Sequence, residues 1–289
     1  MSDIPWPFVG TEALANHLLP ERTIRTRYEQ LYPSVYVPRG VDLSARQRAE
    51  AAWLWSKRRG VVAGQSAAAM LGTKWVDDDK APELIHDNRN APDGLIVRSE
   101  TLSPGEALGI GAMKVTAPAR TAFDVGRHTV SRVLAVQRLD ALANATGVKA
   151  VDVEAVMAAH RGARGMLRLR WVLPLVDGGA ESPPETVARL ALIDAGLPAP
   201  RTQVEVFGRF GEFIARVDMA YEDVKVAIEY DGPQHWTDPL VRQRDIDKGV
   251  ALADLRWHVI RVSSDLLYHR RGTYVHRVST ALRERGFVW

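Results

Sequence analysis

The segment VKVAIEYD, residues 224–231, constrains the fold most strongly, because as a strand it can bury only one of its two faces. Val224, Val226, Ile228 and Tyr230 alternate with Lys225, Ala227, Glu229 and Asp231. Successive side chains of a strand point to opposite faces, so one face is apolar and the other carries two carboxylates. A Gly-Pro turn and Gln-His-Trp follow directly. Two acids beside this turn predict a functional site.

A second strand, FIARVDMAY at residues 213–221, precedes this one and is separated from it by Glu222-Asp223. A tight hairpin would place Asp218 opposite Ala227 and Glu229 one step along the same face, roughly 7 to 8 Å away diagonally. Carboxylates held this close repel one another unless a cation neutralises them. A hard ion such as Mg²⁺, bound by one or two carboxylates, water and phosphate oxygens, is a common solution.

The alternative is an exposed acidic pair at a sheet edge. That alternative explains a single acid, but it explains less well a set of polar side chains that converge from three elements. The candidate catalytic set is Glu185, Asp218, Glu229, Asp231 and His235.

The run DGGAESPPETVARL predicts a boundary followed by a strong helix start, since Gly and Pro gather before it. Ser182 can cap this helix, Pro183 fits its first turn, and Gly196 ends it. Ser182-x-x-Glu185 also matches a capping box, in which Glu185 accepts a hydrogen bond from the Ser182 backbone. The sequence leaves open whether Glu185 is a cap or a catalytic acid.

Length and composition favour a globular protein of two or three domains, with 289 residues of which 46% are hydrophobic and 25% charged. No apolar run approaches the length of a membrane span, and the N-terminus lacks the order of a signal peptide, so a cytoplasmic location is expected. The absence of Cys excludes disulfides, thiolate zinc sites and cysteine nucleophiles. Any metal must therefore bind to oxygen or imidazole.

The net charge of +3 comes from Arg rather than Lys. Arg suits phosphate through its planar fork of donors, although a GC-rich genome gives the same composition without selection on function. In HRGARGMLRLR, three arginines at helical spacing are candidate phosphate contacts, and a solvated helix face is the equal alternative. These arginines are Arg161, Arg164 and Arg168.

Three segments are expected: residues 1–45, 46–178 and 179–289. The first has the order helix, turn, helix, strand of a winged helix-turn-helix, whose second helix would read DNA with Arg22, Arg25 or Arg27. Ordinary helix pairs of this size are the alternative. The middle segment alternates helix-like and strand-like pieces and predicts an α/β domain, in which the acidic run 77–79 is a solvated turn.

The order of motifs in residues 180–289 resembles a known nuclease family. A helix with Glu185, a strand with Asp218, a strand with Glu-x-Asp-Gly-x-x-His, a helix and LRWHVIRV look like the very-short-patch-repair-endonuclease-like branch of the PD-(D/E)XK superfamily. Upstream, SVYVPRG, GQSAAAMLG and PARTAFDVGR are similar to the abortive-infection AbiEi-type antitoxin module. The implied architecture is α/β (α+β), with a winged helix, an AbiEi-like α/β domain and a restriction-endonuclease-like mixed sheet flanked by helices.

The nuclease resemblance implies that Asp218 and Glu229 bind Mg²⁺ or Mn²⁺ and that Glu185 matches the acid of the first helix. The superfamily usually has Lys two residues after the second acid, and this chain has Asp231 there. The very-short-patch branch also lacks that Lys and relies on Asp and His, which His235 can match. Phosphate contacts are expected from Arg242, Arg244 and Lys248, unless these side chains pair with Asp245 and Asp247 along their helix.

The implied activity is hydrolysis of DNA phosphodiester bonds by an endonuclease, with phage defence or DNA repair as its setting. The alternative is a non-catalytic DNA-binding regulator, or an antitoxin-like protein with a degenerate nuclease fold. The expected partner is single- or double-stranded DNA, with no membrane, and a homodimer stays open. The complete acidic set favours the enzyme.

Overall fold

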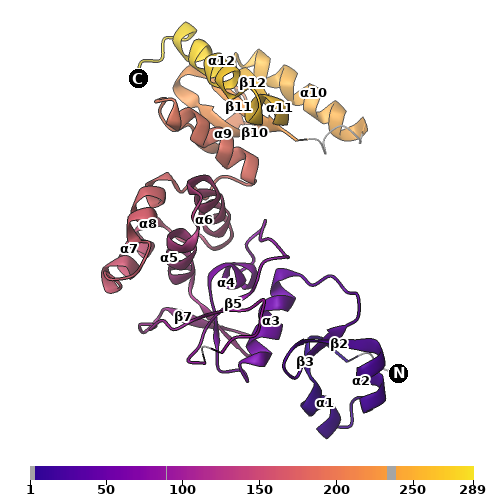
Figure 1. Cartoon of the computed structure of the whole chain (residues 1–289). Coiled ribbons are helices and arrows are strands. Elements are labelled where there is room, and N and C mark those ends of the chain that lie inside the picture. Colours follow the sequence, from indigo (N-terminus) through magenta and orange to yellow (C-terminus); the bar gives the residue numbers. More distant parts are fainter. Residues whose placement is uncertain (1–3, 89, 233–238) are drawn as a thin grey trace. The chain divides into compact units, whose positions relative to one another are not determined.

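The fold is α+β, as the sequence predicts, with helices and three separate sheets (Figure 1). The computed structural model describes residues 4–88, 90–232 and 239–289, and the side chains of 239–245 fall outside this description. The chain divides into two compact units, Met1–Val176 and Asp177–Trp289, called unit 1 and unit 2 below. No helix in the described residues is long and apolar enough to cross a membrane.

Unit 1 begins with a small sheet in the order β1-β3-β2, formed by β1 (Phe8–Val9), β2 (Tyr28–Tyr32) and β3 (Val35–Pro38). Helices α1 (Gly10–Ala15) and α2 (Glu21–Arg27) lie between β1 and β2. The sequence predicts the second helix over ERTIRTRYEQL, residues 21–31, but α2 ends at Arg27. Tyr28 pairs with Pro38 and Tyr32 with Val35, so the apolar residues after Arg27 are used by a strand.

The larger sheet of unit 1 has the order β6-β5-β4-β8-β7. Its strands are β4 (Val61–Val62), β5 (Glu83–Ile85), β6 (Ile96–Arg98), β7 (Ala107–Ile110) and β8 (Met113–Thr116). The accompanying helices are α3 (Ala45–Trp55), α4 (Gly64–Met70), α5 (Pro118–His128), α6 (Arg132–Thr146), α7 (Ala150–Ala159) and α8 (Met166–Val172), and the η1 turn (Leu173–Leu175) follows α8. The three strand-like pieces expected in this segment correspond to β5, β6 and β8.

The two sheets of unit 1 share a hydrophobic core. Tyr32 and Val35 of the small sheet belong to the same buried cluster as Ala49 of α3, Leu84 of β5 and Val115 of β8. Helix α3 packs against all three strands of the small sheet and also against α4 and β5. Burial of this shared surface joins residues 1–45 to the segment that follows them.

A cluster of buried charges organises the second half of unit 1. Arg120 of α5 is 1% exposed and binds Glu106 at 2.6 Å, Glu100 at 2.8 Å and Asp124 at 3.0 Å. Arg127, one helical turn after Asp124, is 3% exposed and pairs with Asp124 at 2.7 Å and with Glu100. Buried charges persist only when they are paired and hydrogen-bonded, which this cluster provides.

Replacement of Arg120 by Ala should destabilise unit 1 by about 3 to 5 kcal/mol, because the buried acids would lose a shared cation. Urea unfolding followed by circular dichroism measures this loss. Arg59→Ala, at an exposed arginine of the same unit, is the control and should change stability by less than about 0.5 kcal/mol. Equal stability of the two variants would contradict a structural role for the cluster.

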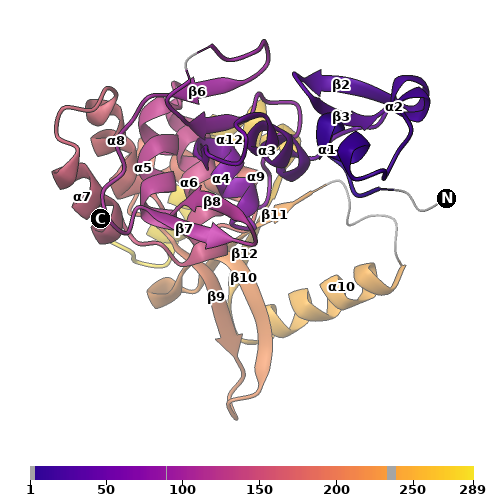
Figure 2. The same ribbon diagram turned by 90° about the horizontal axis from the view of Figure 1, so that it is seen from below.

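Unit 2 is a four-stranded sheet in the order β12-β11-β10-β9 with helices packed on it. It contains α9 (Pro183–Asp194), β9 (Arg201–Phe207), β10 (Phe213–Tyr221), the η2 turn (Glu222–Val224), β11 (Val226–Asp231), α10 (Pro239–Asp254), β12 (His258–Ser263), α11 (Ser264–Tyr268) and α12 (Arg271–Glu284). The turn of the β9–β10 hairpin projects beyond the other strands (Figure 2).

Strands β11 and β12 are parallel, so the chain must cross over between them, and α10 lies in this connection. Helix α10 packs on β10 and β12, whereas α9 and α12 contact each other and β11. The Tyr274 hydroxyl of α12 donates to the Ala188 carbonyl of α9 at 3.3 Å. This arrangement holds the start of α9 and the length of α10 against the same sheet.

The predicted register of the β10–β11 hairpin was wrong by two residues. Ala220, not Asp218, lies opposite Ala227, and Met219 lies opposite Ile228. The cause is the turn: residues 222–224 form a 3-10 helix and Lys225 takes a left-handed conformation with φ 51°, so the strand begins at Val226. A shift of two preserves the face, and continuing the register places Asp218 level with Glu229.

Candidate functional site

The candidate site lies where β10 and β11 separate. The paired residues run from Tyr221 and Val226 to Met219 and Ile228. At the next position the Asp218 carboxylate accepts a hydrogen bond from the Tyr230 backbone amide at 2.7 Å. A side-chain oxygen therefore takes the place of a backbone carbonyl, and the opening between the strands is lined by a carboxylate.

Asp218 carries the strongest electrostatic perturbation of this site. Burial, the nearby charge of Glu185 and the charge of Glu229 together raise its pKa to about 7, although the Tyr230 amide and Lys248 act in the other direction. Desolvation and like charges both disfavour the ionised form of a carboxyl group. The arrangement therefore favours a proton or a cation at Asp218.

Glu185 lies in the first turn of α9 and is 8% exposed. Its carboxylate accepts hydrogen bonds from the Ser182 hydroxyl at 2.7 Å, the Glu181 amide at 2.9 Å and the Gln203 amide group at 3.3 Å. Ser182 makes no side-chain capping bond to the helix, and the backbone donor to Glu185 is that of Glu181, so the capping box weighed from the sequence is not formed. Burial raises the pKa of Glu185.

Glu229 forms an ion pair with Lys248 of α10. The Lys248 ammonium also donates to the Arg216 carbonyl of β10 at 3.1 Å. The sequence predicted that Lys248 contacts phosphate. In the structure it contacts Glu229 and so adds a positive charge to the acidic cluster. Helix α10 thus supplies the positive charge that the strand sequence lacks at position 231.

Asp231 ends β11 and lies beside Arg261 of β12, with the nearest nitrogen and oxygen 3.8 Å apart. The hydroxyl of Tyr230 forms a hydrogen bond with the Ser264 hydroxyl at 2.7 Å. His235 lies outside the described residues. The structure therefore brings together Glu185, Asp218 and Glu229. Asp231 lies further along β11 and pairs instead with Arg261 of β12.

The donor chemistry of the cluster fits a hard divalent ion, although the described residues contain no group of three or more His, Asp or Glu side chains that could hold a metal by themselves. Mg²⁺ keeps several waters and is commonly held by one or two carboxylates together with substrate phosphates. Asp218 and Glu229 would supply those carboxylates, and the ion would offset the burial and the neighbouring negative charges that raise the pKa of Asp218.

The predicted DNA-contacting arginines of α2 are all exposed. Arg25 pairs with Glu21 at 2.8 Å, with both side chains largely open to solvent, so this ion pair holds Arg25 only weakly. Arg22 lies one turn before Arg25 on the same helix, and Arg27 is its last residue. Arg242 and Arg244 lie on α10, but their side chains are outside the described residues.

The expectation that Arg161, Arg164 and Arg168 share one helix face was wrong. Helix α7 ends at Ala159 and α8 begins at Met166, so Arg161 and Arg164 lie in the turn between them. The two glycines at 162 and 165 interrupt the helical run. Arg168 is half-buried on α8 and donates to the Arg127 carbonyl at 2.8 Å, so its guanidinium is part of the protein interior.

Two contributors to the site were missed from the sequence. Gln203 of β9 donates to Glu185, and the Tyr230 backbone amide donates to Asp218. The alternation in RTQVEVF could have indicated β9. A backbone donor has no sequence signal of its own.

Comparisons with known proteins identify relatives without assigning a function. The chain is 35% identical over 167 residues to uncharacterized proteins of Mycobacterium tuberculosis strains CDC 1551 / Oshkosh and ATCC 25618 / H37Rv. The match covers 58% of this chain and 61% of each relative. No family model matches the chain, and no solved structure matches it.

In the metal-free protein, the free energy of unfolding should fall as pH rises from about 4 to about 7. In this range the folded protein keeps a proton on Asp218, whose pKa is about 7, while the unfolded chain loses it near 3.8. Asp218→Asn removes this dependence and should therefore gain about 2 to 4 kcal/mol over the wild type between pH 4 and pH 8. Urea unfolding in EDTA at several pH values measures the difference.

Asp223→Asn provides a matched control, since Asp223 is an exposed aspartate of the η2 turn. Its pH profile should coincide with that of the wild type. If the profile of Asp218→Asn also coincides, Asp218 does not carry the crowded charge inferred above.

Proposed function

We propose that unit 2 is a metal-dependent endonuclease that hydrolyses phosphodiester bonds in DNA. The observation that carries the proposal is the convergence of Asp218, Glu229 and Glu185 where β10 and β11 separate, with Lys248 against them. Structural carboxylates are normally satisfied by cations or by several donors, whereas Asp218 faces two further acids. A divalent ion with phosphate is the ligand that this charge pattern suits.

Asp218 and Glu229 would bind Mg²⁺ or Mn²⁺ through their carboxylate oxygens. When bound, the ion supplies charge stabilisation to a scissile phosphate and lowers the pKa of a coordinated water. Asp218 must lose its proton to act as a ligand, so binding should weaken as pH falls below about 7. Three hydrogen-bond donors fix the Glu185 carboxylate, which would add negative charge beside Asp218.

Lys248 is suited to the role of the Lys that the nuclease superfamily usually has two residues after the second acid. Its ammonium is anchored by the Arg216 carbonyl and reaches Glu229 from α10. When a cation takes over the neutralisation of Glu229, the ammonium can turn to a phosphate oxygen or to the attacking water. His235 remains the second candidate for the proton-accepting group.

The alternative is a protein that binds DNA without cutting it. The Lys248–Glu229 ion pair favours this reading, because it neutralises one acid of the cluster without a metal. The exposed arginines of α2 would serve either function. A cleavage assay separates the two.

The wild type should cut DNA with Mg²⁺ or Mn²⁺ and lose cleavage in EDTA. Plasmid and single-strand substrates resolved on gels measure the rate. Asp218→Asn and Glu229→Gln should abolish cleavage, because each removes a charged ligand while keeping a similar shape. Asp223→Asn is the control and should cut at the wild-type rate. A wild type that cuts no DNA with either ion would favour the non-catalytic alternative.

Lys248→Ala and His235→Ala distinguish the two proton-transfer candidates. The residue that assists the attacking water should lower the rate by roughly two to four orders of magnitude when removed. If His235 acts, activity should also fall at low pH as the imidazole protonates. The wild-type rate in both variants would remove both residues from the mechanism.

Arg22, Arg25 and Arg27 are proposed to deliver the protein to DNA through phosphate contacts. The triple Ala variant should bind duplex DNA more weakly and with a shallower salt dependence, by up to about 0.9 in the log–log slope for each lost phosphate contact. Deletion of residues 1–45 is unsuitable, since Tyr32 and Val35 belong to the shared core of unit 1.

Fluorescence anisotropy over a range of salt concentrations, in EDTA, measures this slope. Arg59→Ala, at an exposed arginine of unit 1, is the control and should keep the wild-type slope. Should the triple variant keep it as well, α2 has no direct role in DNA binding.

A further inference from the structure

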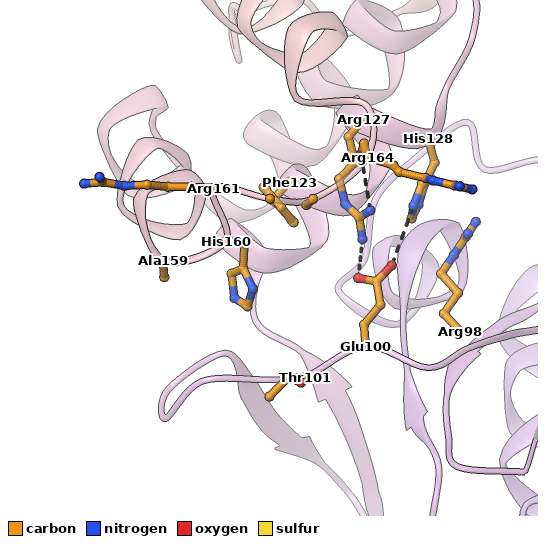
Figure 3. A pocket seen from close by; sticks show the side chains of 12 residues that line it. Arg98, Glu100, Thr101, Phe123, Arg127, His128, Ala159, His160, Arg161 and Arg164 are labelled. Carbon is orange, nitrogen blue, oxygen red and sulfur yellow. Dashed lines mark hydrogen bonds and ion pairs between the residues drawn. The ribbon is translucent and has the colours of Figure 1, made fainter.

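Unit 1 contains a pocket of about 540 Å³ between the end of α5 and the turn that joins α7 to α8 (Figure 3). Phe123 lines it, and the guanidinium groups of Arg120 and Arg127 lie 5.5 and 4.8 Å from the centre of the Phe123 ring. The charged and titratable residues that line it are Arg98, Glu100, Arg127, His128, His160, Arg161 and Arg164. The proposed nuclease uses none of them.

The charge of the pocket is predominantly positive. Glu100 is the only acid among the described lining residues, and Arg120 and Arg127 already bind its carboxylate. Arg161 and Arg164 are exposed, and no ion pair within the described residues engages their guanidinium groups. Two arginines thus remain without an anionic partner beside a carboxylate that is already neutralised.

The wall that carries Arg164 is fixed in place by close backbone contacts. The Arg127 guanidinium donates to the Arg164 carbonyl at 3.5 Å, and the Arg168 guanidinium donates to the Arg127 carbonyl at 2.8 Å. Gly165 has φ 84°, and a Cβ there would lie 2.3 Å from the Arg127 carbonyl oxygen. Only glycine permits this approach, so the turn is held tightly against α5.

His128 adds a neutral hydrogen-bonding group to the same side of the pocket. Burial and the charges of Arg127 and Arg98 lower its pKa to about 3, so the imidazole is uncharged at neutral pH. Its Nδ1 atom is buried without a hydrogen-bond partner in the described structure. Figure 3 shows the side chains of Arg98 and Arg164 extending toward the His128 side of Glu100, while Arg161 extends in the opposite direction.

We propose that this pocket binds a phosphate group, with Arg164 as its principal charged contact and Arg98 and His128 beside it. Arginine presents a planar fork that matches phosphate oxygens, and charge-assisted bonds to phosphate are among the stronger polar contacts in proteins. The phosphate can belong to a free nucleotide or to the end of a nucleic-acid strand. This site is separate from the acidic cluster of unit 2 in both residues and charge.

The test measures binding to the full-length protein by calorimetry in EDTA, which keeps the proposed nuclease inactive. The probes are inorganic phosphate, deoxyadenosine monophosphate, and one oligodeoxynucleotide with and without a 5′-phosphate. The pocket should bind at least one phosphate probe, and Arg164→Ala should weaken that binding at least about tenfold. Preference for the 5′-phosphorylated strand over its unphosphorylated form identifies a strand end, and tighter binding of the mononucleotide identifies a free nucleotide.

Arg59→Ala is the matched control, since it removes an exposed arginine of unit 1 outside the pocket, and it should bind as the wild type does. Cleavage by unit 2 is no part of this measurement, because calorimetry in EDTA reports binding alone, so the two proposals fail independently. The inference is overturned if no phosphate probe binds with a Kd below about 1 mM. It is equally overturned if Arg164→Ala binds as tightly as Arg59→Ala.

Discussion

Burial of a carboxylate beside two others is the constraint on which the candidate site depends. Burial, and then the charges of Glu185 and Glu229, raise the pKa of Asp218 to about 7. The surrounding structure answers locally: the Tyr230 amide binds Asp218 and Lys248 binds Glu229. The second contact comes from α10, so the helix that connects the parallel strands also supplies the counter-charge to Glu229.

The buried acids of unit 1 have a different environment from Asp218, because cations neutralise each of them directly. Asp124 lies between two guanidinium groups and is hydrogen-bonded to both, at 2.7 and 3.0 Å. Each carboxylate of that cluster touches a cation directly. Asp218 instead has one backbone donor at hydrogen-bond distance and two acids nearby. Burial is common to both units, and the balance of partners decides which acid is available to a ligand.

The sequence predicted those parts of the site that follow from strand periodicity. The period of two placed Asp218 and Glu229 on one face, and the expected strand at residues 213–221 coincides with β10. The predicted register of the β10–β11 hairpin was wrong because no local sequence pattern indicates that Lys225 takes a left-handed conformation. Lys248 and Gln203 reach the acids only through tertiary packing. The charge cluster of unit 1 was not predicted, because the spacing of Arg120, Asp124 and Arg127 is that of ordinary ion pairs along a helix. Glu100 and Glu106 come close to them only in the folded structure.

In the nuclease superfamily that unit 2 resembles, a Lys usually occupies the position of Asp231. For the proposed activity, the location of an ammonium group matters more than the position in the sequence from which it comes. What that position supplies is an ammonium near the second acid, and Lys248 brings one there from a neighbouring element. Lys248 neutralises Glu229 by a direct ion pair, and under the proposed function a bound cation would take over that role and free the ammonium. If unit 2 acts as proposed, an ammonium brought from α10 would serve in place of a Lys on β11.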